Sequence, residues 1–162
     1  MRFEFSAGGI VLRQAKDKFK NKKWEVLVAQ HSQHHGWVFP KGLIDQKSNP
    51  STSLGVINQK SKIVRETKEE AAIREVREET GVFAKIIEPL TPVSYWYNFE
   101  GEKIKKTVYY FLMEYMSGDI KEHDFEMENV EWLPIDKIED RLTYKSDREA
   151  WKETGKILNI KD

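Results

Sequence analysis

The chain has 162 residues, a typical length for one domain that builds its own core, so we expect a single domain over residues 1–162. The longest apolar runs fall far short of the about 20 residues that span a bilayer, which excludes a helical membrane protein. Lysine and arginine (27) balance aspartate and glutamate (27), which argues against a globally basic nucleic-acid binder but permits a local basic patch. Cysteine is absent, so disulfides, thiolate nucleophiles and cysteine zinc sites are excluded. The N-terminal residues lack the pattern of a secretion signal, and we expect a cytoplasmic protein.

The first part of the chain predicts three strands and a long loop. Apolar-rich runs predict strands over residues 6–13, 24–30 and 36–39. The charged stretch 14–23 is interpreted as a connection, and Pro40 ends the third strand because it cannot donate a ladder hydrogen bond. The polar stretch 43–65 contains a Ser/Asn/Pro-rich run and predicts a long surface loop, which we expect to be mobile without ligand.

A helix is predicted from Thr67 to Thr80, because Thr67 and Glu70 have capping-box spacing and Gly81 can end a helix. Further strands are predicted over residues 84–88, 93–98, 103–115 and 129–133, with a hairpin turn at 100–102, a short helix opened by Pro134 and an amphipathic helix over 144–160. Strict alternation of strands and helices is absent. The order therefore predicts an α+β domain, an α/β/α sandwich around a mixed sheet, in preference to a doubly wound parallel sheet.

The predicted helix carries three carboxylates on one edge. At about 100° per residue, an arc of roughly 100° holds Glu75, Glu78 and Glu79. The neighbouring apolar face is formed by Ala72, Ile73 and Val76, and the arginines on the other side are Arg74 and Arg77. Like charges at this spacing destabilise a helix by about 0.2–0.5 kcal/mol per pair, and a hard divalent cation would reverse that effect. The pattern indicates a magnesium site acting on a phosphate ester or anhydride, and it equally fits a solvated helix face.

These residues resemble a known sequence signature. Glu66, seven residues and then 74–82 (Arg-Glu-Val-Arg-Glu-Glu-Thr-Gly-Val), preceded by 37–42 (Trp-Val-Phe-Pro-Lys-Gly), resemble the Nudix hydrolase box. The box has five residues between its glycine and its first glutamate, whereas 23 separate Gly42 from Glu66 here, so a loop of 18 residues is inserted at about 46–64. Similarity to the diadenosine tetraphosphate hydrolase branch rests on residues 95–97, 106–112, Glu126 and 130–134.

The resemblance implies the Nudix fold and a role for particular residues. Magnesium, with manganese as the alternative, would be held by Glu75, Glu78, Glu79, the distal Glu126 and the backbone carbonyl of Lys41 or Gly42. Arg74 would orient a carboxylate, and Glu128 is the rival of Glu126 as further ligand or general base. Substrate phosphates would contact Lys41 and Lys106, adenine would stack on Tyr95, Tyr97 or Tyr110, and His35 would line the cleft. A zinc site on the histidines at 31, 34 and 35 is not expected, because no fourth ligand at standard spacing is evident.

The implied activity is hydrolysis of diadenosine tetraphosphate to ATP and AMP. Two alternatives stay open. One is a Nudix hydrolase for a nucleoside triphosphate, a nucleotide sugar, an inositol pyrophosphate or an RNA 5′ end. The other is a non-catalytic nucleotide-binding module. We expect a small-molecule nucleotide as the partner of a monomeric protein, with an RNA 5′ end as the alternative and no membrane or DNA partner.

Overall fold

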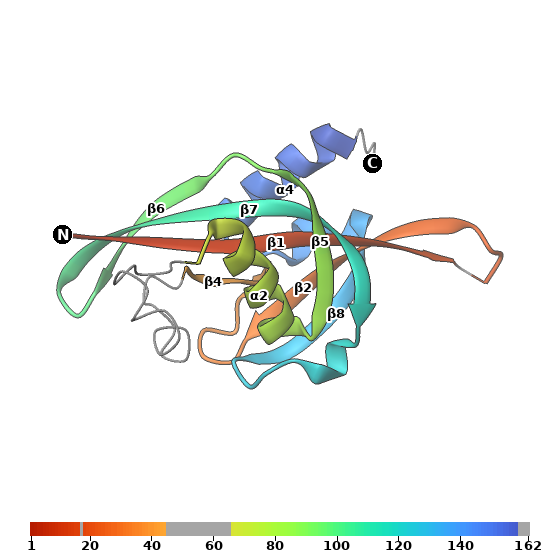
Figure 1. Ribbon diagram of the computed structural model, residues 1–162, viewed down its shortest axis with the longest axis horizontal. Coiled ribbons are helices and arrows are strands. Elements are labelled where there is room, and N and C mark those ends of the chain that lie inside the picture. The colour runs from red at the N-terminus through yellow and green to blue at the C-terminus, as the bar shows by residue number, and fades with distance from the viewer. Residues whose placement is uncertain (17, 45–65, 159–162) are drawn as a thin grey trace, which may run out of the picture.

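A mixed eight-stranded sheet forms the middle layer of the protein (Figure 1). The computed structural model describes residues 1–16, 18–44 and 66–158. The strands are β1 (Arg2–Lys16), β2 (Lys22–His31), β3 (Trp37–Val38), β4 (Lys41–Leu43), β5 (Val82–Pro89), β6 (Val93–Phe99), β7 (Glu102–Gly118) and β8 (Met127–Pro134). The helices are α2 (Lys68–Thr80), α3 (Ile138–Arg141) and α4 (Lys145–Leu158), with 3-10 turns η1 (Ile120–Glu122) and η2 (Ile135–Lys137).

The sheet is mixed because β1 and β7 run parallel while its other pairs are antiparallel. Its main path runs β3-β2-β1-β7-β5. Three further strands extend it, with β4 on β1, β6 on β7 and β8 on β2. Both β1 and β7 are long, so each pairs with different neighbours along its length.

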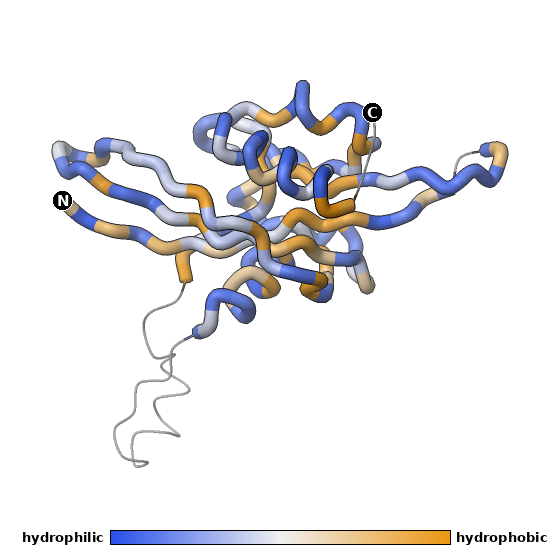
Figure 2. Tube along the Cα trace, turned by 90° about the horizontal axis from the view of Figure 1, so that it is seen from above, coloured by the Kyte–Doolittle hydropathy of each residue, from blue (hydrophilic) through white to orange (hydrophobic). Residues whose placement is uncertain are grey.

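Each face of the sheet is buried by helices, and Figure 2 shows α2 on one side and α4 on the other. On one face Ala71, Ala72 and Val76 of α2 pack with Val11 and Met113 of the sheet. The core on the opposite face includes Ile138 of α3 and Trp151 of α4, packed against sheet residues such as Ile10, Val26 and Leu112. The predicted α/β/α sandwich is confirmed.

Local signals define both ends of α2. The Thr67 side chain accepts from the Glu70 backbone N–H, and the Glu70 side chain accepts from the Thr67 N–H, so the predicted capping box is present. Gly81 has φ 81° and donates its N–H to the Arg77 carbonyl, which ends the helix. The predicted apolar face of this helix is wrong at one residue: Ile73 is 38% exposed, and Ala71 is buried with Ala72 and Val76 instead.

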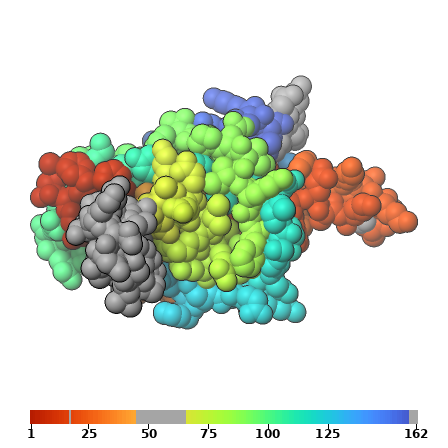
Figure 3. Space-filling view, viewed as in Figure 1, coloured from red at the N-terminus to blue at the C-terminus, as the bar shows by residue number. Residues whose placement is uncertain are grey.

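The predicted connection 14–23 is also wrong, because both strands continue through most of it. Arg13 faces Glu25 and Lys16 faces Lys22 across an antiparallel ladder, so β1 and β2 form a hairpin arm that projects from the body (Figures 1 and 3). At the other end, the hairpin predicted around 100–102 joins β6 to β7 as expected. A second projection is formed by β6, the first residues of β1 and the first half of β7.

The other predicted elements are found with small shifts of their ends. Pro134 leads into η2 and α3, and the amphipathic helix is α4. The insertion at about 46–64 and the last residues of the predicted helix 144–160 lie outside the described residues. Within the described residues no helix is long and apolar enough to cross a membrane.

Candidate active site

A cleft of about 1150 Å³ brings together most of the predicted site residues. The predicted residues that line it are Lys41, Gly42, Glu75, Glu78, Glu79, Tyr95, Tyr97, Lys106 and Glu126. They come from α2, the strands β4, β6 and β7, and the loop before β8. The acidic edge of α2, the basic side chains and the aromatic side chains therefore face one common space.

Two of the three helix carboxylates are withdrawn from water. Glu79 is 3% exposed and accepts from the backbone N–H of Lys41 at 3.2 Å. Burial, followed by repulsion from Glu75, raises the pKa of Glu79 well above its usual value. Burial also raises the pKa of Glu75, with repulsion from Glu78 and Glu126 adding to it. A buried set of mutually repelling carboxylates is stabilised by bound positive charge.

Arg74 supplies part of that charge. Its guanidinium donates to Glu66 at 2.6 and 2.9 Å, to Glu75 at 2.8 Å, to Glu78 at 3.0 Å and to the Leu43 carbonyl at 3.1 Å. The hydrogen bonds to Glu66 are the largest cause that raises the Arg74 pKa. The arginine thus ties β4 and the segment before α2 to the acidic edge, and it orients two carboxylates.

Gly42 allows Glu75 to lie against β4. A methyl group placed on Gly42 would overlap the Glu75 carboxylate, so a larger residue there would displace that side chain. The adjacent Lys41 lines the cleft with Lys106 of β7. Burial and the proximity of Lys41 lower the pKa of Lys106, while Glu4, Glu79 and Glu75 oppose that shift. Two lysine side chains held close together can bind the oxygens of a polyphosphate.

Aromatic side chains form another part of the cleft lining. Tyr95 and Tyr97 share one face of β6, as predicted, with ring centroids 6.3 Å apart, and Phe99 continues the row. The Tyr97 hydroxyl donates to Glu4 of β1, and burial followed by this hydrogen bond raises the pKa of Tyr97 to about 12. Burial raises the pKa of Tyr95 to about 12. Both rings therefore stay neutral near pH 7.

A further aromatic group was missed by the sequence analysis. His31 and His34 stack with centroids 4.3 Å apart, Tyr144 meets His34 edge-on at 5.5 Å, and all three line the cleft. The Nδ1 atom of His34 accepts from the Gly36 N–H at 3.0 Å and lies 3.0 Å from the Tyr144 hydroxyl. The histidine and tyrosine come from sites 110 residues apart in the chain, so only the fold brings them together.

Three predicted or rival site residues lie elsewhere. Tyr110 is 1% exposed in the core and donates to the buried Asp147 at 2.6 Å, so it cannot offer a ring face to adenine. His35, which has φ 61°, is not among the residues that line the cleft, and its Nδ1 lies 2.7 Å from Glu128 Oε1. The rival Glu128 is thereby engaged outside the lining, whereas Glu126 faces the cleft.

The carboxylate oxygens of the acidic residues in the cleft suit a hard divalent cation, because these carboxylates repel one another when no cation is bound. Among the described residues, no three acidic or histidine side chains are already gathered tightly enough to hold an ion. Arg74 accounts for part of this, since it holds Glu75 and Glu78 in their present positions. The lining residues that could supply oxygen ligands are Glu75, Glu78, Glu79, Glu126 and the carbonyl of Gly42.

The family is established by comparison with known proteins. The family model of the NUDIX domain matches residues 5–154, nearly the whole chain. The chain therefore belongs to the NUDIX domain family, and the resemblance expected from the sequence is confirmed at that level. The specific branch is not.

Two curated relatives carry names that differ from the expected branch. The chain is 32% identical over 147 residues to "Putative mutator protein MutT4" of Mycobacterium tuberculosis, a match covering 90% of this chain and 52% of that protein. It is 31% identical over 126 residues to "8-oxo-(d)GTP phosphatase" of Mycolicibacterium smegmatis, covering 78% of this chain and 32% of that protein. The chain thus spans about half of one relative and a third of the other.

Solved structures share the fold at lower sequence identity. The Ap4A hydrolase of C. elegans, in a binary complex, has a TM-score of 0.64 and 22% identity, covering 96% of this chain and 98% of that one. The NUDIX domain of Shewanella oneidensis NrtR, complexed with ADP ribose, has a TM-score of 0.64 and 18% identity, covering 96% and 88%. Similarity at this level establishes the Nudix fold.

Proposed function

We propose that this chain is a divalent-metal-dependent hydrolase that cleaves a phosphoanhydride bond of a nucleotide. We propose diadenosine tetraphosphate as the substrate, with ATP and AMP as products. The observation that carries this proposal is the single cleft in which the acidic edge of α2 faces two lysines and a row of aromatic rings. The monomeric state and cytoplasmic location expected from the sequence stay predictions.

Each group of side chains has a task in this proposal. Lys41 and Lys106 bind the oxygens of the polyphosphate chain. Tyr95 and Tyr97 offer neutral ring faces to a nucleobase, and stacking of this kind contributes about 1–3 kcal/mol per base. Tyr144, with the two stacked histidines beside it, offers further aromatic surface, so the cleft has room for the two nucleosides of a dinucleotide.

The acidic groups act at the phosphorus atom. Glu75, Glu78 and Glu79 would hold the metal ions, and Arg74 keeps Glu75 and Glu78 on the cleft side of the helix. Bound magnesium would neutralise phosphate charge, lower the pKa of the attacking water and stabilise the leaving oxygen. Glu126, which lines the cleft from the loop before β8, is our candidate for a further ligand or for the base that takes the proton of that water.

A second candidate substrate is an oxidised guanosine triphosphate. It is favoured by the name of one relative, the 8-oxo-(d)GTP phosphatase of Mycolicibacterium smegmatis. The cleft could hold a mononucleotide as well, with its base on either aromatic group.

A substrate panel separates the two. Purified protein with magnesium is incubated with diadenosine tetraphosphate, adenosine tetraphosphate, ATP and 8-oxo-dGTP, and products are separated by ion-exchange chromatography. The proposal expects ATP and AMP from the dinucleotide and a slower reaction once one adenosine is removed. Faster release of 8-oxo-dGMP would establish the second candidate, and no turnover of any compound would refute both.

A further inference from the structure

The hairpin arm carries a concentration of positive charge that the proposed hydrolysis does not use. Between residues 13 and 24 the sequence has five lysines, one arginine and one aspartate, in a protein of zero net charge. Figure 3 shows the arm projecting from the body, and Figure 2 shows that it is mostly hydrophilic. The exposed lysines described on it are Lys16, Lys18, Lys20, Lys22 and Lys23.

Acidic residues within the described part of the chain do not balance the charge of these lysines. No ion pair between described residues includes any of the five. Lys16 faces Lys22 directly across the antiparallel ladder, an arrangement of like charges that destabilises a sheet. Arg13 is different, because it pairs with Glu25 at 2.8 Å and stacks 4.2 Å over Trp132. A bound polyanion would reduce the repulsion among these lysines, which have no ion-pair partner among the described residues.

Aromatic rings lie among the lysines. Phe19 is 73% exposed near the tip, with the Lys18 ammonium 5.2 Å from its ring centroid. Trp24 is 37% exposed and faces Gln14 across the ladder. Exposed rings next to cations are the combination that binds single-stranded nucleic acids, in which bases stack while phosphates meet positive charge.

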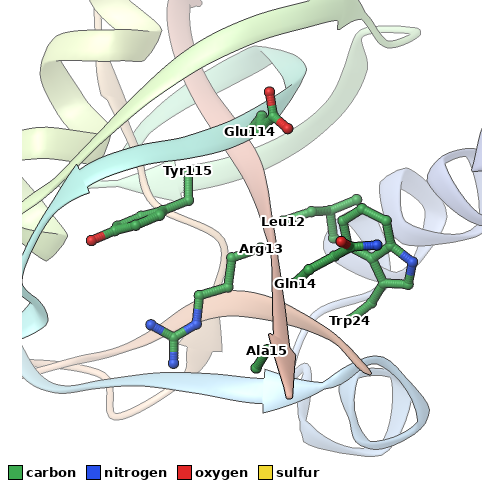
Figure 4. Close-up of a pocket in the computed structure, with 7 residues that line it drawn as sticks. All are labelled: Leu12, Arg13, Gln14, Ala15, Trp24, Glu114 and Tyr115. Atoms are coloured by element: carbon green, nitrogen blue, oxygen red, sulfur yellow. The ribbon is translucent and has the colours of Figure 1, made fainter. Parts of the chain in front are cut away.

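A cavity of about 480 Å³ lies at the base of the arm (Figure 4). It opens where β1 separates from β7, and its lining residues are Leu12, Arg13, Gln14, Ala15, Trp24, Glu114 and Tyr115. Trp24 and Gln14 lie on one side of β1, and Arg13 and Tyr115 on the other. Trp24 and Gln14 therefore offer a ring and an amide beside the lysines, whereas the Arg13 guanidinium on the other side of β1 is already paired with Glu25.

We propose that the arm binds single-stranded nucleic acid. The lysines contact successive phosphates, and bases stack on Phe19 and on Trp24 at the cavity. An acidic peptide would match the charge of the arm but would not use its exposed rings. A membrane surface would contact only one exposed ring at the tip, surrounded by lysines. The charge and the rings together favour the nucleic acid.

The test uses fluorescence anisotropy with labelled oligo(U) RNA of about 12 nucleotides, whose 5′ hydroxyl leaves no phosphoanhydride for the cleft. Affinity is measured at several salt concentrations between about 50 and 200 mM, because each neutralised phosphate contributes about −0.7 to the slope of log K against log salt. Five lysine contacts predict a slope of about −3.5 for the wild-type protein.

The arm variant carries Lys16→Ser, Lys18→Ser, Lys22→Ser and Lys23→Ser. We expect it to bind at least about 10-fold more weakly, with a slope reduced by about 2.8. The control carries the same change at four exposed lysines elsewhere, Lys121, Lys137, Lys152 and Lys156, and should bind like wild type. Phe19→Ala should weaken binding and leave the slope unchanged. Circular dichroism and nucleotide hydrolysis show that each variant is folded.

Three results would overturn the proposal. One is an arm variant that binds RNA as tightly, or with the same slope, as the control variant. Another is absence of RNA binding at the lowest salt. The third is arm-dependent binding of poly-glutamate or of phosphatidylserine vesicles that equals or exceeds binding of RNA and DNA oligonucleotides, which would assign the arm to an acidic protein or a membrane.

Discussion

Replacing Arg74 by lysine keeps the positive charge and removes the planar, forked guanidinium group. The substitution tests whether that fork positions the carboxylates on the acidic edge of α2. The wild-type guanidinium makes five hydrogen bonds, four of them to the carboxylates of Glu66, Glu75 and Glu78. A lysine ammonium can direct its donors to only some of these groups, and we expect about three bonds to be lost.

The size of the effect follows from the exposure of the partners. Hydrogen bonds to charged groups contribute about 1.5–3 kcal/mol each, but the Arg74 side chain is 33% exposed, which screens part of that value. Glu66 and Glu75, at 16% and 12% side-chain exposure, each lose hydrogen bonds from the guanidinium while they stay partly buried. We expect Arg74→Lys to lower the free energy of unfolding by about 2–4 kcal/mol, a shift in Tm of about 5–10 °C at this chain length.

Urea unfolding and calorimetry without divalent cations measure this loss. The matched control is Arg77→Lys on the same helix, where the guanidinium stacks 4.6 Å over Phe83, an interaction that contributes about 1 kcal/mol or less. Equal losses in the two variants, or a loss below about 1 kcal/mol for Arg74→Lys, would refute the role given to the fork.

Three further changes test other parts of the cleft. Tyr97→Ala removes the ring offered to a nucleobase, so KM for a dinucleotide should rise several-fold with kcat little changed, whereas Tyr97→Phe, which loses only the hydrogen bond to Glu4, should keep most of the affinity; an unaltered KM for Tyr97→Ala would contradict the stacking role. Gly42→Ala places a methyl group on the Glu75 carboxylate and should abolish most turnover, whereas Gly155→Ala, with open space around it, should be tolerated; steady-state rates decide. His34 has a pKa below its ordinary 6.5, chiefly through burial, so the folded state resists protonation and the free energy of unfolding should fall as the pH drops through that range. His34→Gln should flatten this pH dependence of the free energy of unfolding, measured by urea titrations. A pH profile identical to that of the wild-type protein would contradict the attribution of the dependence to His34.

Local signals account for what the sequence predicted well. The capping box at Thr67 and the left-handed Gly81 define α2 through contacts a few residues apart, and helical periodicity then places the three glutamates on one edge. The fold class followed from the order of the elements. Strand alternation likewise put Tyr95 and Tyr97 on one face of β6.

Long-range contacts account for what was missed. Tyr110 is buried because α4 supplies Asp147, 37 residues further along the chain, and alternation within β7 cannot show that. His35 instead contacts Glu128, 93 residues further along the chain, while His34 lines the cleft in contact with Tyr144, 110 residues further along. The arm was interpreted as a loop because lysine-rich strands that leave the body have no buried face, and hence no apolar alternation.

The most direct test of the central claim is manganese binding measured by electron paramagnetic resonance with a non-hydrolysable dinucleoside polyphosphate. The account predicts that wild-type protein binds the ion, and that Glu75→Gln, Glu78→Gln and Glu79→Gln each weaken binding by at least about 10-fold. Glu69→Gln, on an exposed position of the same helix, should bind like wild type. Unchanged affinity in all three cleft variants would show that the carboxylates of α2 do not hold the metal, and the proposed hydrolysis would have to be abandoned.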